Sequence, residues 1–245
     1  MVAPRYDRRV SETRDPLNDL EEQLGYRFRD LELLRQALRH GSAVGGSHRR
    51  SYQRLEFLGD AVLGHAIVEL LFERFPERDE GDLTKMKAYL VRSEKLAELA
   101  ALLGLDGYVE MGWSEERAGG NRRTALLEDV LEAVIGALSL DGGWEVARGF
   151  VEELFEREIR DLDDATLRLA DPKSALFEAA QARQLPQPEF RLVQEGGGSG
   201  RPWAFELIWD GKTVARGEGP TKKAAQAQAC RRALIRLGLV NPPGS

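Results

Sequence analysis

Cysteine is almost absent from this sequence of 245 residues, which contains only Cys230. A single cysteine cannot form an internal disulfide, and such scarcity suits a reducing compartment, so we expect a cytoplasmic protein. In the context AAQAQACRRAL, Cys230 is predicted to be a small buried residue. Histidine is scarce too. Because His40, His48 and His65 are isolated and no zinc-ligand spacing is present, we expect neither a zinc centre nor a catalytic histidine.

Long apolar runs are also missing. No stretch approaches the roughly 18 apolar residues of a membrane-spanning helix. The opening MVAPRYDRRVSETRD carries positive charge but no apolar core behind it, unlike a secretory signal. We therefore expect no membrane partner. With 42% hydrophobic and 31% charged residues, the composition is that of an ordinary soluble globular protein.

The chain as a whole has no excess of positive charge, since its net charge is −6. This average hides an asymmetry. Residues 1–170 carry 24 basic and 34 acidic residues, a net charge of −10, whereas residues 171–245 carry 11 basic and 7 acidic residues, a net charge of +4. An acidic body joined to a basic C-terminal part suggests two parts with separate roles.

The apolar pattern changes at the same place. Residues 15–162 repeat apolar side chains at helical spacing, which predicts an all-α domain. Gly25, Gly104 and the pair 142–143 are predicted to end helices, and Asp82 and Ser93 are predicted N-caps. The polar segment 163–170 is predicted to be a short hinge.

Residues 171–240 predict a small α+β domain with the order α-β-β-β-α. Two helical segments, PKSALFEAAQARQL and TKKAAQAQACRRALIRLG, flank three β-rich runs, PEFRLVQE, WAFELIWD and KTVARGEG. Between the last two runs, Asp210 and Gly211 form a two-residue hairpin signature.

Two carboxylates lie on the most apolar helix. The segment YQRLEFLGDAVLGHAIVELLFERFP, residues 52–76, is apolar almost all round, as expected of a helix buried in a core. Glu56 and Asp60 are four residues apart and project into the same sector of this helix. Acidic side chains are seldom buried unless they are paired or bind a cation. The alternative is an exposed helix end with two solvated acids.

A second acid pair favours the cation. In TALLEDVLEAVIGAL, Asp129 and Glu132 are three residues apart on another apolar helix, whereas Glu128 is predicted to point away from them into solvent. Two inward-facing pairs would supply the hard oxygen ligands that Mg²⁺ or Mn²⁺ prefers. Such a site is typical of phosphodiester hydrolysis. Small residues near both pairs are predicted to leave room for a bulky group: Gly59, Gly64, Ala125 and Gly136.

The motifs RLEFLGDAVLG, DEGDLTKMKAYLV, LAELA and LEDVLEAVIGA occur in that order. The first resembles the signature helix of the ribonuclease III family, and the others follow in the family's order and spacing. The C-terminal unit, ending GEGPTKKAAQAQACRRAL, resembles a double-stranded RNA-binding domain. Together the resemblance covers residues 17–239. It implies a bacterial-type protein with an all-α RNase III domain followed by that RNA-binding domain.

The resemblance also implies an activity and a site. The activity is Mg²⁺-dependent cleavage of double-stranded RNA, with 5′-phosphate and 3′-hydroxyl products, in the processing of precursor ribosomal RNA and structured messenger RNA. The implied metal ligands are Glu56, Asp60, Asp129 and Glu132, of which Asp60 and Glu132 are catalytic. Phe57 matches a residue that contacts the partner subunit of a homodimer.

Four residues of the second domain are expected to contact RNA. Lys222 and Lys223 begin its last helix, where exposed backbone amides and the helix dipole favour a phosphate. Ser174 and Gln181 are seven residues apart on one face of its first helix, and the resemblance implies that they touch the minor groove. Proteins recognise duplex RNA mainly by shape and through phosphates and 2′-hydroxyls.

The sequence departs from the family pattern in places. Gln53 stands where many members carry Glu, Phe177 stands where Gln is common, and the loop 196–202, GGGSGRP, lacks a frequent His. RNA affinity or site preference is expected to differ accordingly. Glu80 matches a further acidic position, with a structural role as well supported as a catalytic one.

Two other functions are compatible with parts of this pattern. One is a non-catalytic RNA-binding dimer, which would lack one of the four acids. The other is an all-α Mg²⁺-dependent nucleotide hydrolase in which the basic domain serves only for attachment.

Overall fold

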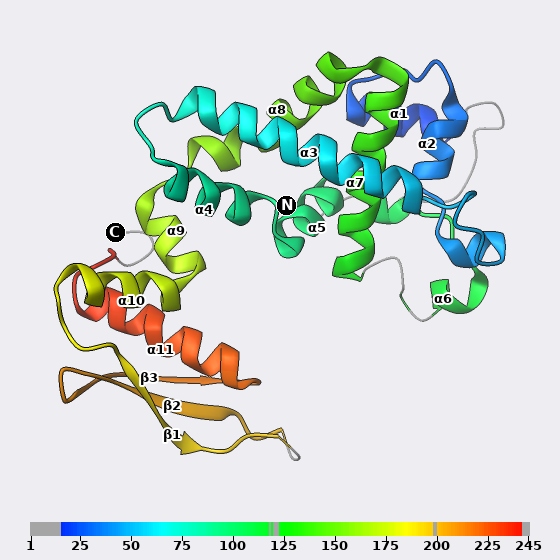
Figure 1. Cartoon of the computed structure of the whole chain (residues 1–245). Coiled ribbons are helices and arrows are strands. Elements are labelled where there is room, and N and C mark those ends of the chain that lie inside the picture. The colour runs from blue at the N-terminus through cyan, green and yellow to red at the C-terminus, as the bar shows by residue number, and fades with distance from the viewer. Residues whose placement is uncertain (1–15, 118, 120–122, 198–199, 242–245) are drawn as a thin grey trace. The chain divides into compact units, whose positions relative to one another are not determined.

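The computed structural model describes residues 16–117, 119, 123–197 and 200–241. The chain divides into two compact units, one ending at Arg160 and the other beginning at Asp161 (Figure 1). Among the described residues, no helix is long and apolar enough to cross a bilayer.

The first unit is helical. Its elements are α1 (Leu17–Leu24), α2 (Leu31–Ala37), η1 (Gly41–Val44), α3 (Gln53–Arg74), α4 (Glu80–Leu90), α5 (Ser93–Leu102), η2 (Leu105–Gly107), α6 (Trp113–Arg117), α7 (Thr124–Gly142) and α8 (Trp144–Arg160). The long helix α3 is the segment that carries the first acid pair, and α7 carries the second.

Helices α3 and α7 cross in close contact (Figure 1), and two glycines lie at the crossing. A Cβ atom on Gly59 would lie 1.7 Å from the carbonyl oxygen of Glu132, and one on Gly136 would lie 2.3 Å from the carbonyl oxygen of Leu55. The two backbones are therefore in direct contact. The prediction that these glycines leave room for a bulky group is wrong, because the space is taken by the partner helix.

The apolar residues of α3 serve two surfaces. Leu55, Ala66 and Leu70 are buried in the core, whereas Phe57 is 83% exposed and Phe72 is 71% exposed in this single chain. A helix that is apolar on both sides thus has one side that the described residues of the unit leave largely exposed.

Two helices have N-cap residues other than those predicted from the sequence, Asp82 and Ser93. Helix α4 is capped by Asp79, whose carboxylate accepts a hydrogen bond from the backbone amide of Asp82 at 2.9 Å. Helix α5 begins at Ser93, with Arg92 in the N-cap position and no side-chain cap. Gly25, with φ of 66°, ends α1 as predicted.

A buried carboxylate fixes the segment between α1 and α2 to the end of α7. Asp141 accepts hydrogen bonds from the Tyr26 hydroxyl at 2.8 Å and from the backbone amides of Arg29 and Asp30 at 2.8 and 2.9 Å. Burial alone would raise the pKa of Asp141, but these donors outweigh it and the pKa is lowered.

The second unit contains α9 (Asp164–Ala170), α10 (Pro172–Ala182), β1 (Glu189–Gln194), β2 (Trp203–Trp209), β3 (Lys212–Gly219) and α11 (Lys222–Arg236). The strands form one antiparallel sheet in the order β1-β2-β3. Asp210 and Gly211 both have positive φ, 50° and 71°, as the predicted hairpin requires. The segment predicted as a hinge contains α9. The predicted fold class, an all-α domain followed by an α-β-β-β-α unit, is confirmed.

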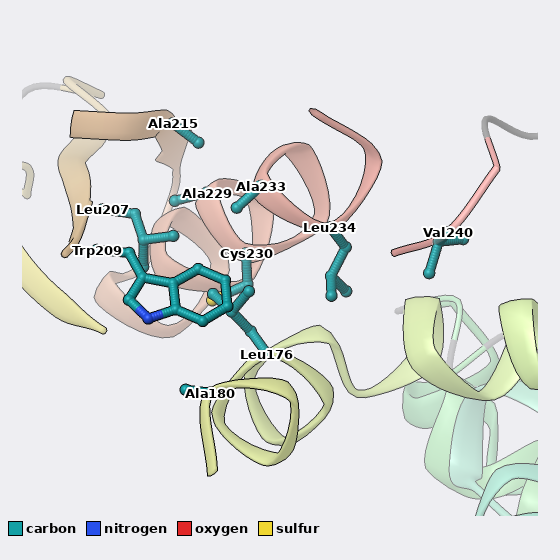
Figure 2. Close-up of a cluster of buried hydrophobic side chains, with 10 residues drawn as sticks. All are labelled: Leu176, Ala180, Leu207, Trp209, Ala215, Ala229, Cys230, Ala233, Leu234 and Val240. Carbon is teal, nitrogen blue, oxygen red and sulfur yellow. The ribbon is translucent and has the colours of Figure 1, made fainter. Parts of the chain in front are cut away.

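Helices α10 and α11 enclose a small core with one face of this sheet (Figure 2). Its buried members are Leu176, Ala180, Leu207, Trp209, Ala215, Ala229, Cys230, Ala233, Leu234 and Val240. Cys230 is buried as predicted, and burial raises the pKa of its thiol to about 11. The cysteine is therefore protonated and unreactive at neutral pH.

Candidate active site and RNA-binding residues

The crossing of α3 and α7 brings the two acid pairs together. Glu132 is half-buried on α7, and its own carbonyl touches Gly59, the residue before Asp60 on α3. The pKa of the Glu132 carboxyl is raised to about 8. Burial is the largest cause, and the neighbouring charges of Asp60, Glu128, Glu56 and Asp129 contribute the rest. We call Glu56, Asp60, Asp129 and Glu132 the acid cluster.

Glu56 belongs to the same electrostatic group. Its side chain is half-buried near the start of α3. Burial raises its pKa, and the charges of Asp129, Glu128 and Asp60 raise it further. Asp60, by contrast, is exposed to solvent. The acid cluster therefore has a half-buried side and an open side.

Asp129 is held by a tyrosine that the sequence did not single out. The hydroxyl of Tyr52, which is buried just before α3, donates a hydrogen bond to Asp129 Oδ2 at 3.0 Å. Burial raises the pKa of Asp129, whereas this hydrogen bond and the nearby His40 lower it. The pKa of Tyr52 is itself raised, by burial and then by the charge of Asp129, so the hydroxyl stays a donor. No local pattern pointed to Tyr52, because its partner lies 77 residues away.

The prediction for Glu128 is wrong. Its carboxylate is half-buried and accepts a hydrogen bond from the hydroxyl of Ser93 on α5. It also raises the pKa of Glu56 and of Glu132. Glu128 and Glu132 are four residues apart, a spacing that places two side chains on one face of a helix. That spacing could have identified Glu128 as a fifth acid beside the cluster.

The donor chemistry of the cluster fits a hard divalent cation. Carboxylate oxygens are the ligands that Mg²⁺ and Mn²⁺ prefer, and a cation would relieve the repulsion that raises the pKa values. Within the described part of the chain, no three Asp, Glu, His or Cys side chains lie close enough to hold an ion as they stand. The like-charged carboxylates would therefore have to converge on a cation.

Three other predicted positions lie outside this electrostatic group. Glu80 begins α4 and accepts a hydrogen bond from Thr84 Oγ1 at 3.1 Å. Gln53 turns toward the loop before α3, where its side-chain oxygen pairs with His48 and with the Ser51 hydroxyl. Phe57 points to solvent.

The predicted RNA contacts are all exposed on the second unit. Ser174 and Gln181 lie on α10, and Lys222 and Lys223 are the first two residues of α11. The N-cap of α11 is Thr221, whose hydroxyl accepts a hydrogen bond from the amide of Ala224 at 3.1 Å.

The departures from the family pattern other than Gln53 also lie in this unit. Phe177 is half-buried on α10, with the Lys173 ammonium 5.9 Å from its ring centroid. Residues 198 and 199 of the 196–202 loop lie outside the described residues.

Comparisons with known proteins agree with both units. The family described as Ribonuclease-III-like matches residues 30–159, and the double-stranded RNA binding motif matches residues 172–237. The chain is 42% identical over 239 residues to Ribonuclease 3 of Azorhizobium caulinodans, covering 96% of this chain and 100% of that protein. It is 42% identical to Ribonuclease 3 of Solibacter usitatus, covering 89% of this chain and 86% of that protein.

Two solved structures resemble the first unit. The nuclease domain of ribonuclease III from Campylobacter jejuni is 39% identical, with a TM-score of 0.57, over 61% of this chain and 100% of that chain. A second structure of the same domain is 40% identical, with a TM-score of 0.55, over 58% of this chain and 96% of that chain, and is described as flexible in a region involved in dimer formation. The chain described here therefore belongs to the ribonuclease III family, as an endoribonuclease with a double-stranded RNA-binding domain.

Proposed function

We propose that the chain cleaves double-stranded RNA with Mg²⁺, for which Mn²⁺ can substitute, held by the acid cluster. Asp60 and Glu132 are its catalytic acids. The observation that carries this proposal is the close crossing of α3 and α7, which brings the four acids together and raises the pKa of Glu132 to about 8. Such a cluster of like charges at a half-buried helix crossing costs stability unless a cation binds there, and perturbed carboxyls are typical of functional sites.

The proposed role of each residue at the site follows from its exposure and its contacts. A bound Mg²⁺ stabilises the charge that develops on a phosphodiester during hydrolysis. Asp60 is exposed and faces the side from which RNA can approach. Glu132 is half-buried, and its carboxyl would have to release its proton when a cation binds, because the pKa of about 8 is that of the free chain. Tyr52 keeps Asp129 in one orientation through its hydroxyl.

A homodimer is part of this proposal. Phe57 and Phe72 on one side of α3 are left largely exposed by the part of the unit that the structure describes, although both side chains are large and apolar. Exposed apolar patches of this kind typically mark protein interfaces. Two subunits joined along α3 would supply two acid clusters, one for each strand of a duplex. Both strands would then be cut, and we expect 5′-phosphate and 3′-hydroxyl ends on each.

The second unit supplies RNA affinity. Lys222 and Lys223 contact phosphates beside the start of α11, and Ser174 and Gln181 on α10 contact the minor groove. Exposure of all four side chains and the net charge of +4 on residues 171–245 support this assignment. The substrates are precursor ribosomal RNA and structured messenger RNA in the cytoplasm. Mapping RNA 5′ ends in cells with and without the protein tests that choice.

A nuclease assay tests the central claim. The full chain is incubated with a long RNA duplex and Mg²⁺, and the same reaction is run with Glu132→Gln, with EDTA and with single-stranded RNA. We expect cleavage only of the duplex and only with the divalent ion, by the unchanged chain and not by Glu132→Gln. Glu153→Gln on α8 is a matched control, because Glu153 lies outside the acid cluster.

Each failure points to a different error. An intact duplex with the unchanged chain would contradict the nuclease function, and full activity in Glu132→Gln would contradict the site assignment. Hydrolysis of free nucleotides in place of the duplex would favour the nucleotide hydrolase that the sequence alone left open.

A further inference from the structure

We propose that Trp203 is a positioning residue that holds the ammonium of Lys222 ready for a phosphate of double-stranded RNA. The inference rests on the proposed RNA-binding role of Lys222 and adds to it a residue that neither the sequence pattern nor the family match assigns. The Lys222 Nζ atom lies 4.5 Å from the centroid of the Trp203 ring, within the range of a cation–π contact. Indole is the side chain that binds a cation most strongly in this way.

The backbone fixes the two residues relative to each other. Trp203 begins β2 and pairs with Gly219, the last residue of β3. A Cβ atom on Gly219 would lie 2.7 Å from the backbone nitrogen of Ala225 and 2.9 Å from the side chain of Ala224. The end of β3 is therefore pressed against the first turn of α11, one residue after Lys223. The contact between the indole and Lys222 follows from this packing.

The indole also contacts the chain just after β1. A Cβ atom on Gly196 would lie 2.7 Å from Trp203 Cδ1, so the chain at Gly196 passes directly against the edge of the ring. The side chain of Gln194 donates a hydrogen bond to the carbonyl of Pro202 at 2.8 Å, which ties β1 to the residue before Trp203. Trp203 is half-buried, so one part of the ring is packed and another is open to solvent.

The neighbouring carboxylates that the structure describes do not occupy the Lys222 ammonium, which is therefore available to bind a phosphate. The nearby carboxylate of Glu218 pairs with Arg216 at 2.9 Å. Across the described residues, Lys222 has no carboxylate partner, and Lys223 has neither a ring nor a carboxylate partner. A lysine side chain loses rotamer freedom when it binds a phosphate. Contact with the indole restricts Lys222 beforehand, whereas Lys223 keeps that freedom.

The test measures binding of the full chain to an RNA duplex in EDTA, where no cleavage occurs, over a series of salt concentrations. The variants are Trp203→Leu, Trp203→Phe, Lys222→Ala and Lys223→Ala, together with Trp203→Leu combined with each of the two lysine changes. Leucine keeps apolar bulk and removes the aromatic face, whereas phenylalanine keeps a face. Thermal melting of each variant checks that the second unit stays folded.

We expect Trp203→Leu to weaken binding about two- to fivefold, the size of an exposed cation–π contact, and Trp203→Phe to recover part of the loss. Lys222→Ala should weaken binding and reduce the slope of log K against log salt by about 0.9, the value for one phosphate contact. In the Lys222→Ala background, Trp203→Leu should have no further effect. In a Lys223→Ala background, it should cost as much as in the unchanged chain.

Three results would overturn the inference, and they are distinguishable. Additive losses in the combined variant would mean that Trp203 contacts RNA by itself. A loss in Lys222→Ala with none in Trp203→Leu would leave the RNA role of Lys222 intact and remove that of Trp203. If Lys222→Ala bound RNA with unchanged affinity, neither Lys222 nor Trp203 would have the proposed role in RNA binding.

Discussion

Glu132 stands where its negative charge is disfavoured, and this has a consequence for the stability of the single chain. A carboxyl whose pKa is raised in the folded state stabilises the fold at low pH, below its ordinary pKa of 4.5, and this stability is lost as the pH rises through about 8. The acid cluster thus costs stability at and above neutral pH when no cation is bound. Residues kept at such a cost are typical of functional sites.

Glu132→Gln should therefore raise the melting temperature in EDTA, and the gain should widen between pH 5 and pH 9, because the variant has no charge to lose or gain. The same change should lower duplex cleavage by about a hundred- to a thousandfold, as expected from the loss of several kcal/mol of metal-derived stabilisation. Melting curves across pH and a cleavage assay measure the two effects. If Glu132→Gln melted at a lower temperature than the unchanged chain at pH 9, the raised pKa of Glu132 would be contradicted.

Tyr52→Phe removes the hydroxyl that donates a hydrogen bond to Asp129. Loss of such an outer hydrogen bond typically lowers metal affinity or activity about ten- to a hundredfold. We expect the Mg²⁺ concentration for half-maximal cleavage to rise, with little change in the melting temperature. The matched control is Tyr26→Phe, which removes the hydroxyl that donates a hydrogen bond to Asp141. This change should lower stability without changing the Mg²⁺ dependence. Equal Mg²⁺ dependence in both variants would show that Tyr52 does not act on the site.

The helices build the site through the closeness of α3 and α7. Because Gly59 and Gly136 let the two backbones touch, acids on both helices come within electrostatic reach of one another. The helices gain from the same contact, since each buries an apolar side in the crossing. Packing and site geometry therefore depend on the same two positions.

Gly59→Ala should destabilise the first unit by about 3 kcal/mol or more, because its methyl group would overlap the Glu132 carbonyl and the helices would have to separate. Gly149→Ala on α8 is the matched control, since a Cβ atom there meets nothing within 4 Å. That change should stabilise the helix by up to about 1 kcal/mol. Urea unfolding followed by circular dichroism measures both, and equal stability of the two variants would contradict the close crossing.

The whole molecule combines an acidic catalytic unit with a basic RNA-binding unit. The first carries the acid cluster, which repels phosphates without a cation, and the second has the positive charge that attracts them. This division explains how a chain with a net charge of −6 can bind RNA. Its RNA affinity should accordingly depend on the second unit and on salt.

Phe57→Ala tests the proposed dimer. Since Phe57 is 83% exposed in the single chain, its loss should leave the fold of each subunit unchanged and weaken only the association. Truncation of a central aromatic side chain at an interface typically costs about 2 kcal/mol or more, a roughly thirtyfold weaker dimer. Sedimentation velocity measures the shift from dimer to monomer. Leu102→Ala, at a residue 76% exposed on α5, is the control and should leave the dimer intact.

Much of this protein could be predicted from local pattern. The helical spacing before residue 163, the hairpin at Asp210 and Gly211, and the buried Cys230 each depend on neighbours within a few residues. The two acid pairs could be identified for the same reason, because residues three or four apart share a helix face. Their places on two apolar helices suggested one metal site, and the family resemblance implied the same four acids.

What local pattern could not supply are the contacts between distant segments. Tyr52 reaches Asp129 across 77 residues, and Ser93 reaches Glu128 across 35 residues. The small residues near the acids suggested open space, but the tertiary structure fills it with the backbone of the opposite helix. The sequence by itself determined which residues we propose for the chemistry, because side-chain type and helical spacing are local properties. Only the tertiary structure decided which of them interact, because that depends on how closely two helices pack.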